Sequence, residues 1–201
     1  MRPPFERIDP TGSETPVVVE IPHAGLDLAP HFLEPLTAPA RAIARDADLY
    51  VLIGKFYESR SDGKRAEEAY RSALNLSPQH PQASNNLARL MVQTGGNLDV
   101  ALSLAQTARR GLPESPSIAD NLAWIDYQKG AYQSAIGLLQ EALKLQEKKK
   151  TPDNPDIHYH LGMAYAKSGQ TALARQQFER VLKINPNSND AKKQLAQLKS
   201  S

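Results

Sequence analysis

The strongest constraint on the fold is a set of small, aromatic and alanine positions that returns four times along the 201-residue chain. The small residue that begins each copy is Gly54, Ala88, Ala123 or Gly162, and successive copies are 34, 35 and 39 residues apart. In the clearest copy, offsets of 3, 12, 16 and 24 from Gly162 hold Tyr165, Ala174, Phe178 and Pro186; the same offsets from Gly54 hold Tyr57, Ala66, Tyr70 and Pro78. A period near 34 residues is typical of a helical solenoid.

Each unit has the pattern of two amphipathic helices joined by a short turn. In the third unit we expect one helix over residues 117–129, a break at Gly130, and a second helix that begins at Ala131. The small first residue and the alanine at offset 12 predict that the two helices approach closely, since neither places bulk between the backbones. The proline at offset 24 then ends the second helix because it lacks an amide proton.

The two departures from the 34-residue period fall in polar stretches, where insertion is cheap. One extra residue lies within residues 93–97, and five lie within residues 148–154. We interpret Lys148, Lys149 and Lys150 in the second stretch as a solvated run rather than a phosphate site. The expected organisation is all-α, with units over residues 47–80, 81–115, 116–149 and 155–188, an insertion over 150–154 and a capping helix over 189–199.

These residues resemble the tetratricopeptide repeat over about residues 47–199. The resemblance implies a non-enzymatic scaffold that binds a protein or peptide segment in a concave groove lined by the first helix of each unit. The positions that the resemblance places in the groove are Asn85, Asn86, Arg89, Gln93, Asp120, Asn121, Trp124, Gln128, Tyr159, His160, Met163 and Lys167.

Two interpretations of the groove residues remain open at the level of sequence. Asn86 and Asn121 lie at equivalent positions one repeat apart, and they are either ligands for a peptide backbone or polar residues near helix starts with solvent partners. Trp124, the single tryptophan, is either an exposed anchor or core filler between units. His158 and His160 are two residues apart on a predicted helix and therefore point in different directions, which excludes a shared metal ion.

Residues 1–50 do not carry the repeat. Residues 15–21, TPVVVEI, have the composition of a short strand. The string from Pro16 to Tyr50 resembles the start of the N-formylglutamate amidohydrolase family, and this resemblance implies that His23 is a zinc ligand. A catalytic zinc needs about three protein ligands, and the repeats replace the rest of such a domain. We therefore expect residues 1–46 to be an amidohydrolase-like fragment without catalysis, in a fused or chimeric chain.

Charge and hydropathy bear on partners and location. Residues 1–50 hold 4 Arg against 8 acidic residues, whereas residues 51–201 hold 20 Lys or Arg against 14 acidic residues. Neither basic runs with interleaved aromatics nor about 18 consecutive apolar residues occur, so we expect neither nucleic-acid binding nor membrane insertion. No secretory leader is recognisable, which predicts a cytoplasmic chain. The strings GGNLDVAL and DNLAW resemble repeats of bacterial envelope and exopolysaccharide-export proteins, and this resemblance implies envelope association as the alternative if the chain is a fragment. Self-association is the alternative to binding another protein.

Overall fold

The computed structural model describes residues 46–198, and these residues form an all-α array with no strand among them. The helices are α3 (Ala47–Ser59), α4 (Gly63–Leu76), α5 (Pro81–Gln93), α6 (Leu98–Gly111), α7 (Pro116–Gln128), α8 (Tyr132–Lys149), α9 (Pro155–Lys167), α10 (Thr171–Ile184) and α11 (Asn189–Gln197). The predicted strand over residues 15–21 lies outside the described residues. The predicted all-α solenoid is confirmed.

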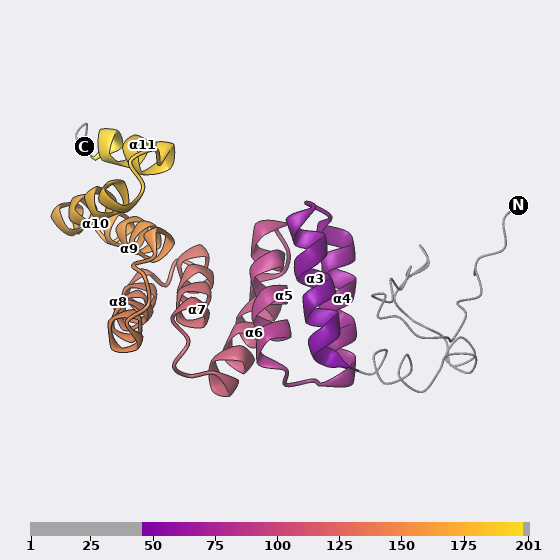
Figure 1. Ribbon diagram of the computed structural model, residues 1–201. Coiled ribbons are helices and arrows are strands. Elements are labelled where there is room, and N and C mark those ends of the chain that lie inside the picture. Colours follow the sequence, from indigo (N-terminus) through magenta and orange to yellow (C-terminus); the bar gives the residue numbers. More distant parts are fainter. Residues whose placement is uncertain (1–45, 199–201) are drawn as a thin grey trace, which may run out of the picture.

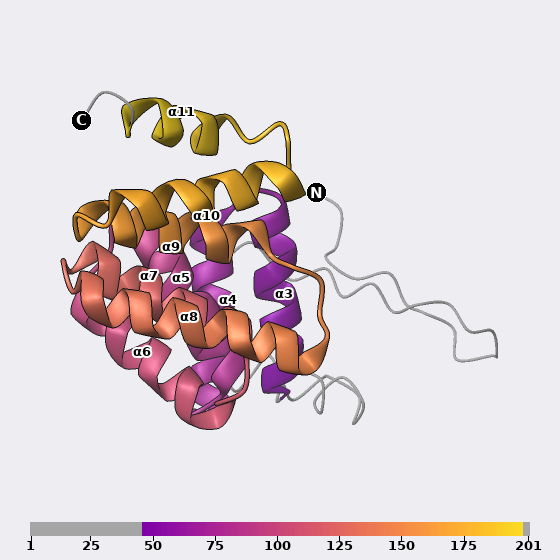
Figure 2. The ribbon, with the colours of Figure 1, turned by 90° about the vertical axis from the view of Figure 1, so that its left-hand side faces the viewer.

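Successive helices pair as antiparallel hairpins, α3 with α4, α5 with α6, α7 with α8 and α9 with α10, and each hairpin packs on the next. The stack twists as it proceeds, so that α3 and α4 stand upright in Figure 2 whereas α8, α10 and α11 lie across the view. The helix α11 covers α10 at the C-terminal end of the array, and α3 and α4 form the other end (Figure 1).

Short sequence signals begin the helices. Proline occupies the first turn of α5, α7 and α9, where its missing amide proton has no helical partner to lose. The side chains of Asp46, Asn97, Asn154 and Ser188 each accept a backbone N–H at the start of α3, α6, α9 and α11. The turns between paired helices contain a left-handed residue at the same offset in every unit: Ser61, Gly95, Gly130 and Gly169.

In the first and fourth repeats, the glycine that begins the repeat makes room for an aromatic ring. A Cβ atom placed on Gly54 would lie 2.3 Å from Tyr70 Cε1, and one on Gly162 would lie 2.6 Å from Phe178 Cε1. Both rings are fully buried. The close approach predicted from the small first residue and the alanine at offset 12 therefore also involves the residue at offset 16 in these two units. The units that begin with alanine carry Ala105 and Leu139, rather than a ring, at the corresponding position.

Two apolar clusters fill the array, one in the first two hairpins and one in the last two. The helix α7 contributes to both, because Leu122 and Ile125 pack with the first cluster while Ala123 and Tyr127 pack with the second. Residue Leu138 contacts both clusters from α8. A single helix with two buried sides thus joins the halves of the array into one continuous packed structure.

The third unit differs from the sequence prediction at its end. Lys148 and Lys149 belong to the last turn of α8, which agrees with the predicted unit of residues 116–149 but makes the start of the polar stretch 148–154 helical rather than irregular. Lysine is a good helix former, and its positive charge is favourable near a helix C-terminus. Lys148 also forms an ion pair with Glu114, so it is not simply solvated. The helix ends at Lys149, and the C-cap residue Lys150 adopts a left-handed conformation.

Candidate functional site

The twelve residues predicted to line a groove come from three helices that are neighbours in space. The first helix of each later hairpin, α5, α7 and α9, contributes four of them, and α7 contacts both of the others. Within each helix the four positions follow the same spacing, which places them on one side. We call this side of α5, α7 and α9 the A-helix face.

Between the first two hairpins, the A-helix face is held by an ion pair. Arg89 of α5 donates through Nη2 to Glu58 of α3 and through Nη1 to Gln93 Oε1, 3.3 Å away. The Glu58 carboxylate also lies beside the buried Tyr70 hydroxyl; burial, and then this carboxylate, raise the pKa of Tyr70 above its usual range. Arg89 is half-buried and Gln93 is exposed, so Gln93 is the more accessible of the two.

Between α5 and α7, the face is held by a chain of amides. Asn121 Nδ2 donates to Asn85 Oδ1 at 2.9 Å, and Asn85 Nδ2 donates to Asn86 Oδ1 at 3.4 Å. Asn86 is 8% exposed, which does not fit the alternative that it faces solvent, and Asn121 is half-buried. The two asparagines at equivalent repeat positions, Asn86 and Asn121, are not bonded to each other, because Asn121 pairs with the neighbour Asn85.

Between α7 and α9, the face is held by an acid, an imidazole and stacked rings. His160 Nδ1 donates to Asp120 Oδ1 at 2.7 Å, and the imidazole stacks on Trp124 with ring centroids 4.2 Å apart. Trp124 also stacks on Tyr127, with ring centroids 4.7 Å apart and an interplanar angle of 5°. Burial raises the pKa of Tyr127. The ring of Trp124 is thereby fixed in orientation while remaining partly exposed.

The remaining predicted residues surround this stack. Tyr159 is half-buried, and its ring lies edge-on to His160 and tilted against Phe178. Burial raises the pKa of Tyr159. Met163 is half-buried, whereas Gln128 and Lys167 are exposed. The structure therefore brings the predicted residues together on one face, with the aromatic ones gathered on α7 and α9.

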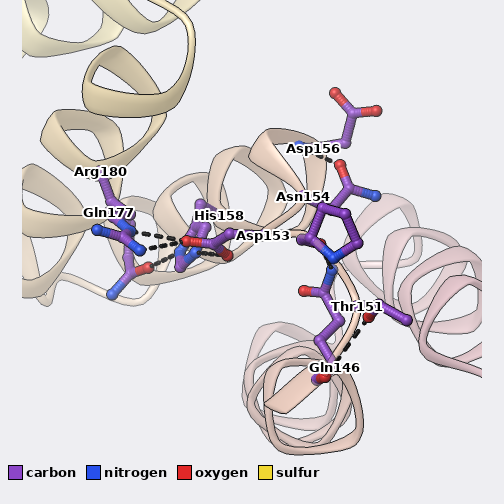
Figure 3. A network of polar contacts seen from close by, with 9 residues as sticks. Gln146, Thr151, Asp153, Asn154, Asp156, His158, Gln177 and Arg180 are labelled. Atoms are coloured by element: carbon purple, nitrogen blue, oxygen red, sulfur yellow. Dashed lines mark hydrogen bonds and ion pairs between the residues drawn. The ribbon is translucent and has the colours of Figure 1, made fainter. Parts of the chain in front are cut away.

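The sequence analysis did not identify a second polar cluster, at the insertion before α9. Asp153 accepts hydrogen bonds from His158 Nε2 at 2.8 Å and from Arg180 Nε at 2.8 Å, and the other ring nitrogen of His158 lies 2.7 Å from Gln177 Oε1 (Figure 3). Burial alone would raise the pKa of Asp153, but the hydrogen bonds from His158 and Arg180 outweigh it and hold the pKa below its usual range. These bonds tie the insertion to α9 and α10.

The preceding helix holds the other end of the insertion. Gln146 of α8 donates through Nε2 to the carbonyl of Pro152 at 2.9 Å, and the backbone N–H of Thr151 donates to the carbonyl of Gln146 at 3.1 Å (Figure 3). The insertion is thus fixed from both sides. In the sequence, the insertion is recognisable only as a departure from the 34-residue period. This departure does not predict which residues contact Asp153.

The described residues do not form a cluster of candidate metal ligands. His158 and His160 are each hydrogen-bonded to a different aspartate, and residues 46–198 contain no group of three or more acidic, histidine or cysteine side chains able to hold a metal ion. His23 lies outside the described residues. Within residues 46–198, no helix combines the length and apolar composition needed to cross a membrane.

Comparison with known protein families finds repeats in the same part of the chain as the helical hairpins. Sequence profiles described as tetratricopeptide repeat match residues 52–116, 92–148 and 126–198. These matches begin at residue 52 and give no support to the amidohydrolase resemblance of residues 1–50.

Individual relatives are distant and longer. The chain is 25% identical to the mouse BBSome complex member BBS4 over 158 residues, 29% of that protein. It is 25% identical to the type IV pilus assembly protein PilF of Pseudomonas aeruginosa over 162 residues, 81% of this chain and 62% of PilF. The chain thus spans less than two thirds of either protein.

Among solved structures, the chain is similar to PilW, described as a widely conserved type IV pilus biogenesis factor. The TM-score is 0.68 at 22% identity, with 77% of this chain and 69% of PilW covered. It is also similar to YrrB, described as a tetratricopeptide-repeat protein with an unusual peptide-binding site, with a TM-score of 0.61 at 22% identity and 82% and 83% of the two chains covered. At these identities the likeness concerns the fold.

Proposed function

The chain belongs to the tetratricopeptide-repeat family, whose members are protein-interaction scaffolds, and we propose that it binds a peptide or protein segment along the A-helix face. The supporting observation is the fixed stack of His160, Trp124 and Tyr127. A rigid, partly exposed aromatic surface loses little conformational freedom when a partner docks on it, and such residues dominate binding energies.

The surroundings of the stack suit an extended segment. Exposed amides at Gln93 and Gln128 can both donate to and accept from a peptide backbone, and Lys167 supplies a charge beside them. The buried members of the face, Asn85 and Asp120, already bond to neighbouring helices. In this proposal they hold the helices in place, and the aromatic and exposed residues meet the partner.

The single tryptophan of the chain provides a direct assay. We expect the fluorescence of Trp124 to change when a bound peptide, selected from a display library on the immobilised full chain, covers its exposed edge. Gln128→Ala should weaken binding severalfold, because the lost amide faces the partner. Gln106→Ala, an equally exposed glutamine on α6, is the matched control and should leave affinity unchanged.

An additional substitution separates binding from folding. Trp124→Ala should abolish binding while far-ultraviolet circular dichroism stays helical, because Trp124 is only partly buried. Selected peptides that bind Trp124→Ala and Gln128→Ala as tightly as the original chain would refute the A-helix face as the binding surface.

We also propose association with the cell envelope as the setting for this function. The motivation is the similarity to PilF over 81% of the chain. Fractionation of bacteria expressing the chain, with immunodetection in envelope and soluble fractions, tests it; recovery only in the soluble fraction would contradict it.

A further inference from the structure

The helix α3 presents an uncovered apolar surface at one end of the array. Leu52 is 61% exposed and Phe56 is 54% exposed, the highest values among the large apolar side chains of the described residues. They are four residues apart on α3 and therefore lie side by side. The end formed by α3 and α4 has no further helix stacked on it within residues 46–198 (Figure 1). We call this surface the α3 end face.

At the opposite end of the array, the terminal apolar surface is covered by a helix. The helix α11 packs on α10, where it buries Ala191 and places Leu195 and Leu198 against the second apolar cluster. An array of stacked repeats is stabilised when its terminal apolar surfaces are covered by an added segment with a polar outer side. The α3 end face lacks that cover among the described residues.

Charge on the α3 end face indicates what kind of segment fits. Lys55 is exposed between Leu52 and Phe56 and forms no ion pair within the described residues, and the Arg60 guanidinium lies 5.4 Å from the centre of the Phe56 ring. Asp48, four residues before Leu52, adds one exposed carboxylate, which pairs with His80. The surface is therefore apolar, and its border carries two cations, Lys55 and Arg60, against this one acid. It is complementary to a segment that combines apolar residues with acidic ones.

Residues 1–45 of the chain have this chemistry and the necessary reach. They contain 6 acidic residues against 4 arginines, together with the apolar stretches VVV at 17–19 and FL at 32–33. They lead directly into Asp46, the residue that caps α3. Phe56 lies ten residues beyond Asp46, about 15 Å along a helix at 1.5 Å per residue. A segment of 45 residues, at up to about 3.3 Å each, can span this distance several times over.

We propose that residues 1–45 bind the α3 end face of their own chain and cover Leu52 and Phe56. Covalent linkage favours this occupant over a second copy, because a tethered segment has a high effective concentration that does not depend on dilution. The proposal gives residues 1–45 a structural role that requires neither a metal ion nor the amidohydrolase chemistry. It is independent of the peptide-binding function proposed for the A-helix face.

Site-specific spin labelling tests the proposal on the full chain, which contains no cysteine. Ser59→Cys introduces a label at an exposed position seven residues from Leu52, on the same side of α3. We expect amide resonances of residues 1–45 to lose intensity in the labelled chain. A label at Gln176→Cys, exposed on α10 near the other end, is the matched control and should leave those resonances unaffected.

Two further samples decide between occupants. Adding Leu52→Glu and Phe56→Glu to the Ser59→Cys chain should restore the intensity of the resonances of residues 1–45. Both substitutions are at exposed positions, so the helical content of the chain should not change. A mixture of labelled, isotopically unlabelled chain with unlabelled, isotopically enriched chain should show no loss of intensity. If the resonances of residues 1–45 lost intensity in this mixture, a second copy would occupy the α3 end face. If they lost intensity in no sample, the face would be uncovered. Either result overturns the proposal.

Discussion

The fit between Gly162 and the Phe178 ring leads to a prediction in which a normally stabilising substitution becomes harmful. In an ordinary helix, alanine in place of glycine is favourable by about 1 kcal/mol. At Gly162, however, the new Cβ would lie 2.6 Å from Phe178 Cε1 and 2.9 Å from two further ring atoms. The ring is fully buried and has no space to retreat, so overpacking should cost up to about 3 kcal/mol. We expect Gly162→Ala to destabilise the array by about 2 kcal/mol.

Gly137 supplies the matched control on the same type of helix. It lies within α8, is exposed, and a Cβ atom added there would meet nothing within 4 Å. Only the helix-propensity difference then operates, so Gly137→Ala should stabilise the array by about 1 kcal/mol. A second-site change completes the test, since the repeat that begins with Ala123 carries Leu139 instead of a ring. In a Phe178→Leu background, most of the cost of Gly162→Ala should disappear.

Urea denaturation followed by circular dichroism measures the order of stability, and amide hydrogen exchange in α9 and α10 localises the effect, because repeat arrays open in parts. Gly162→Ala should shift the midpoint down and speed exchange in α9 and α10, whereas Gly137→Ala should shift the midpoint up. If Gly162→Ala stabilised the chain as Gly137→Ala does, or if its cost were the same with Phe178→Leu, the packing argument would be wrong.

Three further predictions concern the turns, the insertion and the A-helix face. Ser61 adopts a left-handed conformation where other turns have glycine, so Ser61→Gly should stabilise by up to about 1 kcal/mol, and Gly169→Ala should destabilise by a similar amount, in the same urea assay. The lowered pKa of Asp153 means that its contribution is present above the unfolded value of about 3.9 and lost as pH falls through the lower folded value. Asp153→Asn should therefore lower the free energy of unfolding by about 1 kcal/mol at pH 7, and this loss should disappear in acid. A loss of stability that does not depend on pH would contradict the prediction. Asn121→Ala leaves Asn85 Oδ1 without its donor and should destabilise by about 1–2 kcal/mol, and a double-mutant cycle with Asn85→Ala should show coupling rather than additivity.

The sequence was sufficient to predict the array and the set of residues on the A-helix face, because both follow from a period that survives loop insertions. It also contained the ring-against-glycine fit, since Gly54 and Gly162 precede aromatic residues by the same interval whereas Ala88 and Ala123 do not. The sequence pattern alone assigns the close approach to the small first residue and the alanine at offset 12, and it does not show that the ring at offset 16 occupies the space beside the glycine. Volume complementarity between two helices becomes clear only when their facing positions are known.

Other features depend on geometry that no local pattern encodes. Whether Asn85 or Asn86 meets Asn121 is decided by the twist between successive hairpins, and adjacent residues on a helix differ by about 100° in direction. The contacts of Asp153 join an irregular segment to two helices, and irregular segments have no periodicity from which to predict a partner. Lys148 and Lys149 begin the polar stretch 148–154 in the sequence and yet continue α8, because an exposed last helical turn needs no apolar stripe.

The polar pairs along the A-helix face differ in chemistry from one junction to the next. An ion pair joins α3 to α5, an amide pair joins α5 to α7, and an aspartate with a histidine joins α7 to α9. Hairpins built on one repeat pattern can in principle stack on the wrong neighbour during folding, because their apolar surfaces are alike. If α7 took the place of α5 against α3, the Glu58 carboxylate would lose the Arg89 guanidinium, and a half-buried charge would remain unpaired. Distinct pairs therefore favour the native neighbours over others that apolar packing alone does not distinguish. Of the three pairs, only Asp120 with His160 also positions a ring that stacks on Trp124.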